Sequence, residues 1–204
     1  MNESEISLLR RLLPLIVATI DDRSWRVRWT AASKFADVVT AYDGLENAAD
    51  FLVAAYEKLL NDPEAEVRTA ATFNLAKVAS CSSRVPEPLG RAPTEQEIAE
   101  YNGPRVSVGE RLVKRVTSLT EDDSEHVRAA LAMVATELAP ILGMDATITH
   151  LVPPVLLLLR DAASEVRLNL ISSLEALNQV IGVDLLSQSL LPAILDLAQD
   201  GKWR

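Results

Sequence analysis

The sequence predicts an all-α protein in which one helix pair recurs four times and begins a fifth time. A motif of Asp, with Val five residues later and Arg six residues later, occurs at four places in the 204 residues. Behind each Val, apolar residues follow at offsets of four, eight and eleven, which is the spacing of one helix face. The motif residues are Asp22, Val27 and Arg28; Asp62, Val67 and Arg68; Asp122, Val127 and Arg128; and Asp161, Val166 and Arg167.

A second apolar segment lies ten to six residues before each Asp and predicts another helix, joined to the first by a short turn. The four valines are separated by 40, 60 and 39 residues. A period near 40 with two helices is typical of HEAT and armadillo arrays, because tetratricopeptide and ankyrin units are shorter, at about 34 and 33 residues. The chain has no alternating β-branched runs with hairpin turns, which argues against a sheet protein.

The pattern as a whole predicts a single HEAT-repeat solenoid over residues 1–204. It is an α–α superhelix of about four helix pairs plus one extra terminal helix. The long spacing of 60 residues indicates an insertion, and residues 83–105 hold four prolines and two glycines, which predict a loop with a short helix over 94–101. The expected repeats are 5–44, 45–82, 106–143, 145–182 and a partial repeat 184–204.

The Asp and Arg of the motif are predicted to be structural. Each Asp is expected to cap the start of the second helix, where its carboxylate can accept from free backbone N–H groups. Each Arg lies one to two turns into that helix and, in a stack, would reach the Asp of the next unit with charge-assisted hydrogen bonds. An anionic ligand for these arginines is the alternative. The predicted ladder contains Asp22, Arg28, Asp62, Arg68, Asp122, Arg128, Asp161, Arg167 and Asp200.

Composition limits the partners and the location. The net charge of −9 and the pI near 4.8 argue against nucleic acid, which binds clustered Lys and Arg. The longest largely apolar runs are nine residues, far below the ~20 of a membrane span, so no membrane insertion is expected. The single Cys81 fits a reducing compartment. The expected location is the cytoplasm, with the nucleus as a second location.

No catalytic, metal or cofactor motif is found in the sequence. The two histidines, His126 and His150, have no second metal ligand at usable spacing, and Cys81 has no nearby His. The glycines are scattered and form no phosphate loop. Paired acids such as Asp122 and Asp123 belong to the predicted turns. We therefore expect no enzyme activity and no cofactor.

Several segments resemble one HEAT-repeat family, the scaffold (A, 65 kDa regulatory) subunit of protein phosphatase 2A. The turns DDRSWRVR and QDGKWR, at residues 21–28 and 199–204, carry this resemblance. The stretches 141–154, 165–182 and 186–204 match in the same order, and the likeness omits only residues 1–7 and 84–104. The chain resembles a central part of a longer array and is expected to be a fragment.

The resemblance implies a non-catalytic scaffold whose intra-repeat turns hold the phosphatase catalytic subunit together with a regulatory (B-type) subunit. The catalytic subunit would bind mainly beyond the C-terminal end of this chain. Trp25 and Arg26 match a turn associated with regulatory-subunit binding, and Trp and Arg commonly dominate interface energetics. The alternative is that Trp25 folds back onto its own helix pair. The candidate docking residues are Arg23, Ser24, Trp25, Arg26, Glu64, Glu66, Asp123, Glu125, Ser164, Glu165, Lys202, Trp203 and Arg204.

Two other classes of protein stay open. One is an importin-like HEAT transport receptor or another HEAT adaptor. The other is a HEAT-like enzyme, either a bilin lyase or a base-repair glycosylase, although the acidic charge disfavours a glycosylase. In every case the end repeats are predicted to expose apolar surface, which favours self-association.

Overall fold

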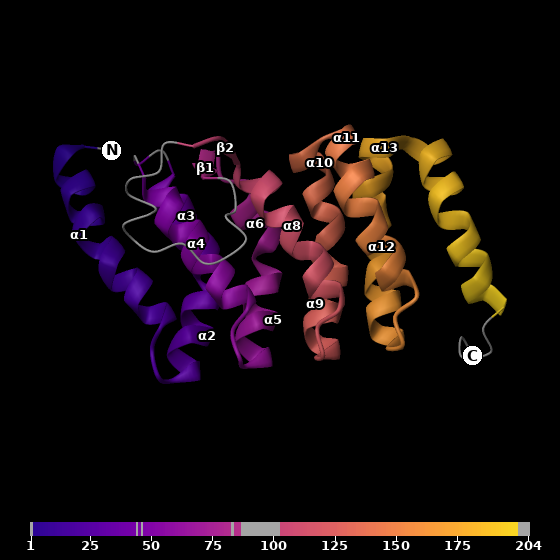
Figure 1. Cartoon of the computed structure of the whole chain (residues 1–204), viewed down its shortest axis with the longest axis horizontal. Coiled ribbons are helices and arrows are strands. Elements are labelled where there is room, and N and C mark those ends of the chain that lie inside the picture. Colours follow the sequence, from indigo (N-terminus) through magenta and orange to yellow (C-terminus); the bar gives the residue numbers. More distant parts are fainter. Residues whose placement is uncertain (1, 44, 46, 83, 87–102, 200–204) are drawn as a thin grey trace. The chain divides into compact units, whose positions relative to one another are not determined.

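The computed structural model describes residues 2–43, 45, 47–82, 84–86 and 103–199 (Figure 1). The chain forms two compact units, which we call unit 1 (Met1–Leu112) and unit 2 (Val113–Arg204). The division falls inside α8 (Val108–Thr120). Helices dominate both units, which confirms the predicted all-α class. No helix in the described part of the chain is long and apolar enough to cross a membrane.

Unit 1 contains two successive helix pairs. Helix α1 packs on α2 and α4, and α2 packs on α5 (Figure 1), so second helices contact each other from one repeat to the next. Aromatic and leucine side chains of α4 fill the core; Tyr56 stacks on Phe35 with ring centroids 5.0 Å apart. The helices and strands are α1 (Glu3–Ile20), α2 (Trp25–Ser33), α3 (Phe35–Tyr42), α4 (Ala48–Leu60), α5 (Ala65–Phe73), α6 (Leu75–Ala79), β1 (Arg84–Pro86) and β2 (Arg105–Ser107).

Unit 2 contains the following two second helices, and α9 packs directly on α13. Gly182 bends α13 with φ of 80°, a left-handed conformation that glycine adopts at little cost. The part before this bend is the second helix of the fourth predicted repeat. The elements are α9 (Glu125–Val134), the 3₁₀-helix η1 (Ala135–Leu138), α10 (Ala139–Leu142), α11 (Met144–Ala146), the π-helix η2 (Thr147–Leu151), α12 (Val152–Leu159) and α13 (Ser164–Gln199).

The second helices of the first three repeats are interrupted, a feature that the apolar periodicity did not predict. Lys34 separates α2 from α3, Asn74 separates α5 from α6, and α9 changes to the 3₁₀-helix η1 after Val134. The Asn74 amide donates to the Ala32 carbonyl of the preceding repeat at 3.0 Å and to the Ala70 carbonyl at 3.1 Å. The Asn74 side chain therefore links the interruption between α5 and α6 to α2 of the preceding repeat.

The described ends of the insertion, which were predicted as loop, form two short paired strands. Strands β1 and β2 are antiparallel, and Val85 of β1 is fully buried. Arg105 of β2 forms an ion pair with the buried Asp50 of α4. Burial raises the pKa of Asp50, while the hydrogen bond from Arg105 opposes this shift. The helix predicted over 94–101 lies outside the described residues.

Candidate docking surface on the intra-repeat turns

The four motif aspartates close one kind of turn. In each, the carboxylate Oδ1 accepts from the backbone N–H two residues later, as in an Asx turn. The donors are Ser24 at 2.7 Å, Glu64 at 2.9 Å, Ser124 at 2.9 Å and Ala163 at 2.8 Å. The second helices all begin three residues after the Asp, so the prediction that Asp caps them is wrong. The carboxylate is held in the turn, where it can also accept from an arginine.

Each motif arginine folds back onto its own turn. Its Nη1 donates to the carbonyl of the Asp six residues earlier in all four repeats. The distances are 2.8 Å for Arg28, 2.7 Å for Arg68, 2.6 Å for Arg128 and 2.7 Å for Arg167. In all four repeats the carbonyl of the residue after the Asp accepts a second, longer hydrogen bond from the same nitrogen. In each repeat, an arginine side chain of the second helix thus holds the turn that precedes that helix.

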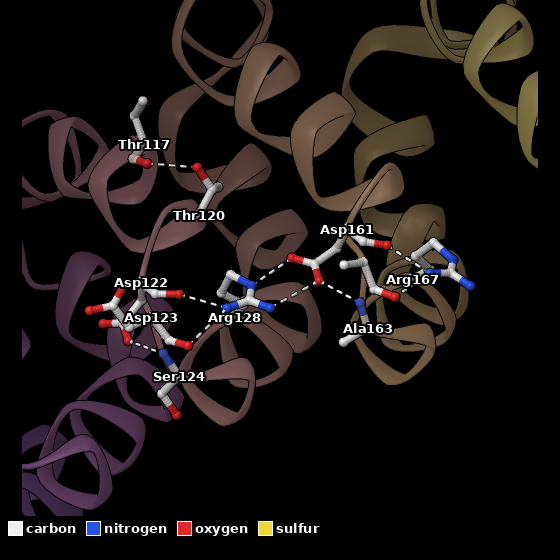
Figure 2. Close-up of polar contacts among 10 residues, drawn as sticks. Thr117, Thr120, Asp122, Asp123, Ser124, Arg128, Asp161, Ala163 and Arg167 are labelled. Atoms are coloured by element: carbon white, nitrogen blue, oxygen red, sulfur yellow. Dashed lines mark hydrogen bonds and ion pairs between the residues drawn. The ribbon is translucent and has the colours of Figure 1, made fainter.

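The remaining nitrogens of Arg28 and Arg128 reach the next turn. Arg28 donates from Nε and Nη2 to Asp62 at 2.6 and 2.9 Å. Figure 2 shows the same fork in unit 2, where Arg128 donates to Asp161 at 2.6 and 3.2 Å. These hydrogen bonds to a carboxylate raise the pKa of both arginines. All three nitrogens of each guanidinium are used within the molecule, which argues against the alternative of an anionic ligand.

The other two ladder steps are not described. Arg68 and Asp122 belong to different units, and Asp200 lies outside the described residues. Lys58 makes a further contact that the repeat pattern did not predict. Its Nζ lies 2.9 Å from Asp21, and both side chains are exposed. No local signal identifies this pair, because it depends on how α4 lies against the first turn.

The first turn presents the aromatic and cationic residues that the sequence singled out. Trp25 is the first residue of α2 and is half-buried, and Arg23, Ser24 and Arg26 are exposed. The Arg26 guanidinium carbon lies 4.7 Å from the Trp25 ring centroid, a cation–π contact. The two side chains therefore form one aromatic and cationic pair at the turn.

The other described turns are acidic. Glu64 and Glu66 in the second turn, Asp123 and Glu125 in the third, and Glu165 in the fourth are exposed, as is Ser164. The candidate residues Lys202, Trp203 and Arg204 lie outside the described residues. The turns share one backbone geometry but differ in the charge of their exposed side chains. They can therefore contact different groups of a partner protein.

Unit 1 also contains an open apolar groove between α1 and the following second helix. Its volume is about 330 Å³. Val27 in this groove is 38% exposed, whereas Val67, at the same repeat position, is fully buried. The groove is lined by Ile16, Thr19, Val27, Thr30, Ala31, Lys34, Phe35 and Val38.

Helix pairs with a shared Asp–Arg turn define an α-helical repeat protein. The chain belongs to the family described as PIK3R4-like, middle domain, whose model matches residues 3–202. A designed armadillo repeat protein, solved with a (KR)4 peptide, has the same type of fold. It shows a TM-score of 0.55 and 22% identity, and the match covers 95% of this chain and 79% of that one.

The chain is also similar to the beta isoform of the 65 kDa regulatory (A) subunit of human serine/threonine-protein phosphatase 2A. They are 36% identical over 102 residues, which are 50% of this chain and 14% of that protein, so the match spans a small part of its length. This finding confirms the resemblance predicted from the turn sequences. The family, the relative and the repeat fold support a protein-interaction scaffold with protein partners.

Proposed function

We propose that the chain is a non-catalytic scaffold of a protein phosphatase 2A assembly. In this proposal its intra-repeat turns bind the catalytic subunit together with a regulatory (B-type) subunit. The similarity to the 65 kDa regulatory protein of phosphatase 2A supports the proposal, and the net charge of −9 favours protein partners over nucleic acid.

The observation that supports the proposal best is the pair Trp25 and Arg26. The cation–π contact restrains the half-buried Trp25 and the Arg26 side chain before binding, so these two side chains lose less entropy when a partner docks there. The acidic turns that follow would add rim charge, which mainly changes association rate and specificity. The first turn is thus the proposed anchor for the regulatory subunit.

The test is the double substitution Trp25→Ala and Arg26→Ala, with binding of a purified B-type regulatory subunit measured by calorimetry. We expect the affinity to fall at least about fivefold, because interface Trp and Arg truncations are often among the most costly. Trp29→Ala is the matched control: Trp29 lies four residues away, is 45% exposed and is outside the turn. The affinity of the Trp29→Ala variant for the regulatory subunit should change less than about twofold.

Equal losses in the double variant and the control would remove the first turn from the site. A pull-down with three parallel baits, namely a small GTPase, the catalytic subunit or the regulatory subunit, tests the wider proposal. Retention of the GTPase alone would instead favour the HEAT transport receptor.

A further inference from the structure

Every second helix exposes a large apolar side chain at one of two repeat positions on the same face, and α2 and α13 also expose Val27 and Ile171. The two repeat positions lie two and six residues after the repeat Val and are one helical turn apart. At the other of the two positions the residue is small or polar: Ser33, Thr69, Ala129 and Ser172. The exposed residues are Trp29 at 45%, Phe73 at 46%, Met133 at 46% and Leu168 at 53%.

In unit 2, Met133 and Leu168 lie on α9 and α13, which pack against each other. Glu137 lies four residues after Met133, while Glu165 and Glu175 lie three residues before and seven residues after Leu168, so each glutamate is near the face of its apolar neighbour. All three glutamates are exposed. We call these five residues the α9–α13 surface.

No exposed lysine or arginine balances these acids on the two second helices. Arg128 and Arg167 are the arginines of α9, η1, α10 and of α13 before its bend at Gly182, these segments contain no lysine, and α9 also carries the exposed His126. Both donate to carbonyls of their own turns, and Arg128 also pairs with Asp161. The second helices of unit 1 differ, because exposed Arg26, Lys34 and Lys77 offset exposed Asp37 and Glu66. The acidic rim is therefore specific to unit 2.

We propose that the α9–α13 surface docks a basic amphipathic peptide segment of a partner protein. Apolar side chains of the segment would pack on Met133 and Leu168, and its Lys or Arg side chains would pair with the glutamates. Methionine adapts to different apolar contacts, and rim charges of one sign select partners of the other sign. Four of its residues lie on the helices away from the intra-repeat turns, whereas Glu165 also belongs to the fourth turn. The proposal does not depend on phosphatase subunits.

The probe is a fluorescein-labelled amphipathic peptide of Lys and Leu, about 14 residues or four helical turns long. Two companions replace every Leu by Ser or every Lys by Glu. Fluorescence anisotropy with the 204-residue chain is measured near 0.15 M salt, where screening acts beyond about 8 Å. We expect the Lys/Leu peptide to bind at least about fivefold tighter than either companion.

Two variants test the two halves of the surface. Met133→Ser with Leu168→Ser, and Glu137→Gln with Glu165→Gln and Glu175→Gln, should each weaken binding at least about fivefold. Each has a matched control that should change affinity less than about twofold. For the apolar pair the control is Trp29→Ser with Phe73→Ser. For the acids it is Asp37→Asn with Glu64→Gln and Asp123→Asn, which removes the same charge elsewhere.

Circular dichroism of every variant verifies the fold, since all the substituted residues are exposed. The proposal is overturned if a control weakens binding as much as its test variant. It is also overturned if the Ser companion binds as tightly as the Lys/Leu peptide, because attraction to the net charge would then explain the binding. The proposal is supported if both test variants lose affinity for the Lys/Leu peptide and neither control does.

Discussion

Each motif arginine joins two turns through one planar group. In Arg28, Nη1 holds the Asp22 carbonyl of its own turn while Nε and Nη2 hold the Asp62 carboxylate of the next. A lysine has one ammonium and could not serve both turns with this geometry, since the fork needs several fixed donors. The spacing of Asp and Arg predicted their pairing. It could not reveal that the Asp precedes the helix, because a carboxylate accepts equally well in a cap or in an Asx turn.

At this scale we predict that Arg28→Ala lowers the free energy of unfolding by about 2 kcal/mol, because it leaves the nearly buried Asp62 carboxylate without its fork. Arg23→Ala in the same turn is the control, since Arg23 is exposed, and should cost less than about 0.5 kcal/mol. Urea denaturation of the three proteins measures both values. Equal costs would show that the ladder contributes no more than an ordinary surface charge.

At the scale of elements, contacts between neighbouring second helices use the same position in both units. Asn74 and Ser173 both lie seven residues after the repeat Val. Asn74 donates to the Ala32 carbonyl, and Ser173 donates to the equivalent Ala132 carbonyl at 3.0 Å. The apolar periodicity located the helices but not this link, because a single Asn or Ser on a helix more often points to solvent.

We therefore predict that Asn74→Ala destabilises unit 1 by about 1–2 kcal/mol, because the carbonyls of the buried Ala32 and Ala70 lose their amide donor. Lys34→Ala is the matched control at the same repeat position; Lys34 is exposed and should cost less than about 0.5 kcal/mol. Chemical denaturation measures both. If Asn74→Ala costs no more than Lys34→Ala, the link between the helices is not stabilising.

The insertion shows where element prediction from sequence ends. Its described strands have three residues each, and one of them contains Pro86, so no alternating pattern marks them. The contacts that attach this segment to the rest of unit 1 come from residues far away in the sequence. Arg105 of β2 pairs with Asp50, and Arg111, at the start of α8, donates to the buried Glu57. Both acids lie on α4, more than 50 residues earlier, and such distant pairs follow only from the packed structure.

At the scale of the whole molecule, equivalent repeat positions differ in energy, because each repeat is stabilised by its neighbours. Val67 is fully buried, and its helix α5 packs on α2 of the preceding repeat. Val27 faces the open groove instead. The sequence correctly predicted the shared position of the two valines, but their burial depends on what covers each helix.

We predict that Val67→Ala lowers the free energy of unfolding by about 2 kcal/mol, from lost burial and a residual cavity. Val27→Ala should cost less than about 1 kcal/mol, since its side chain is 38% exposed. Repeat proteins can unfold in parts, so native-state hydrogen exchange of the α5 amides should accompany urea denaturation. Equal losses at the two valines would mean that the groove is closed in solution, and the first repeat would then be as well covered as the second.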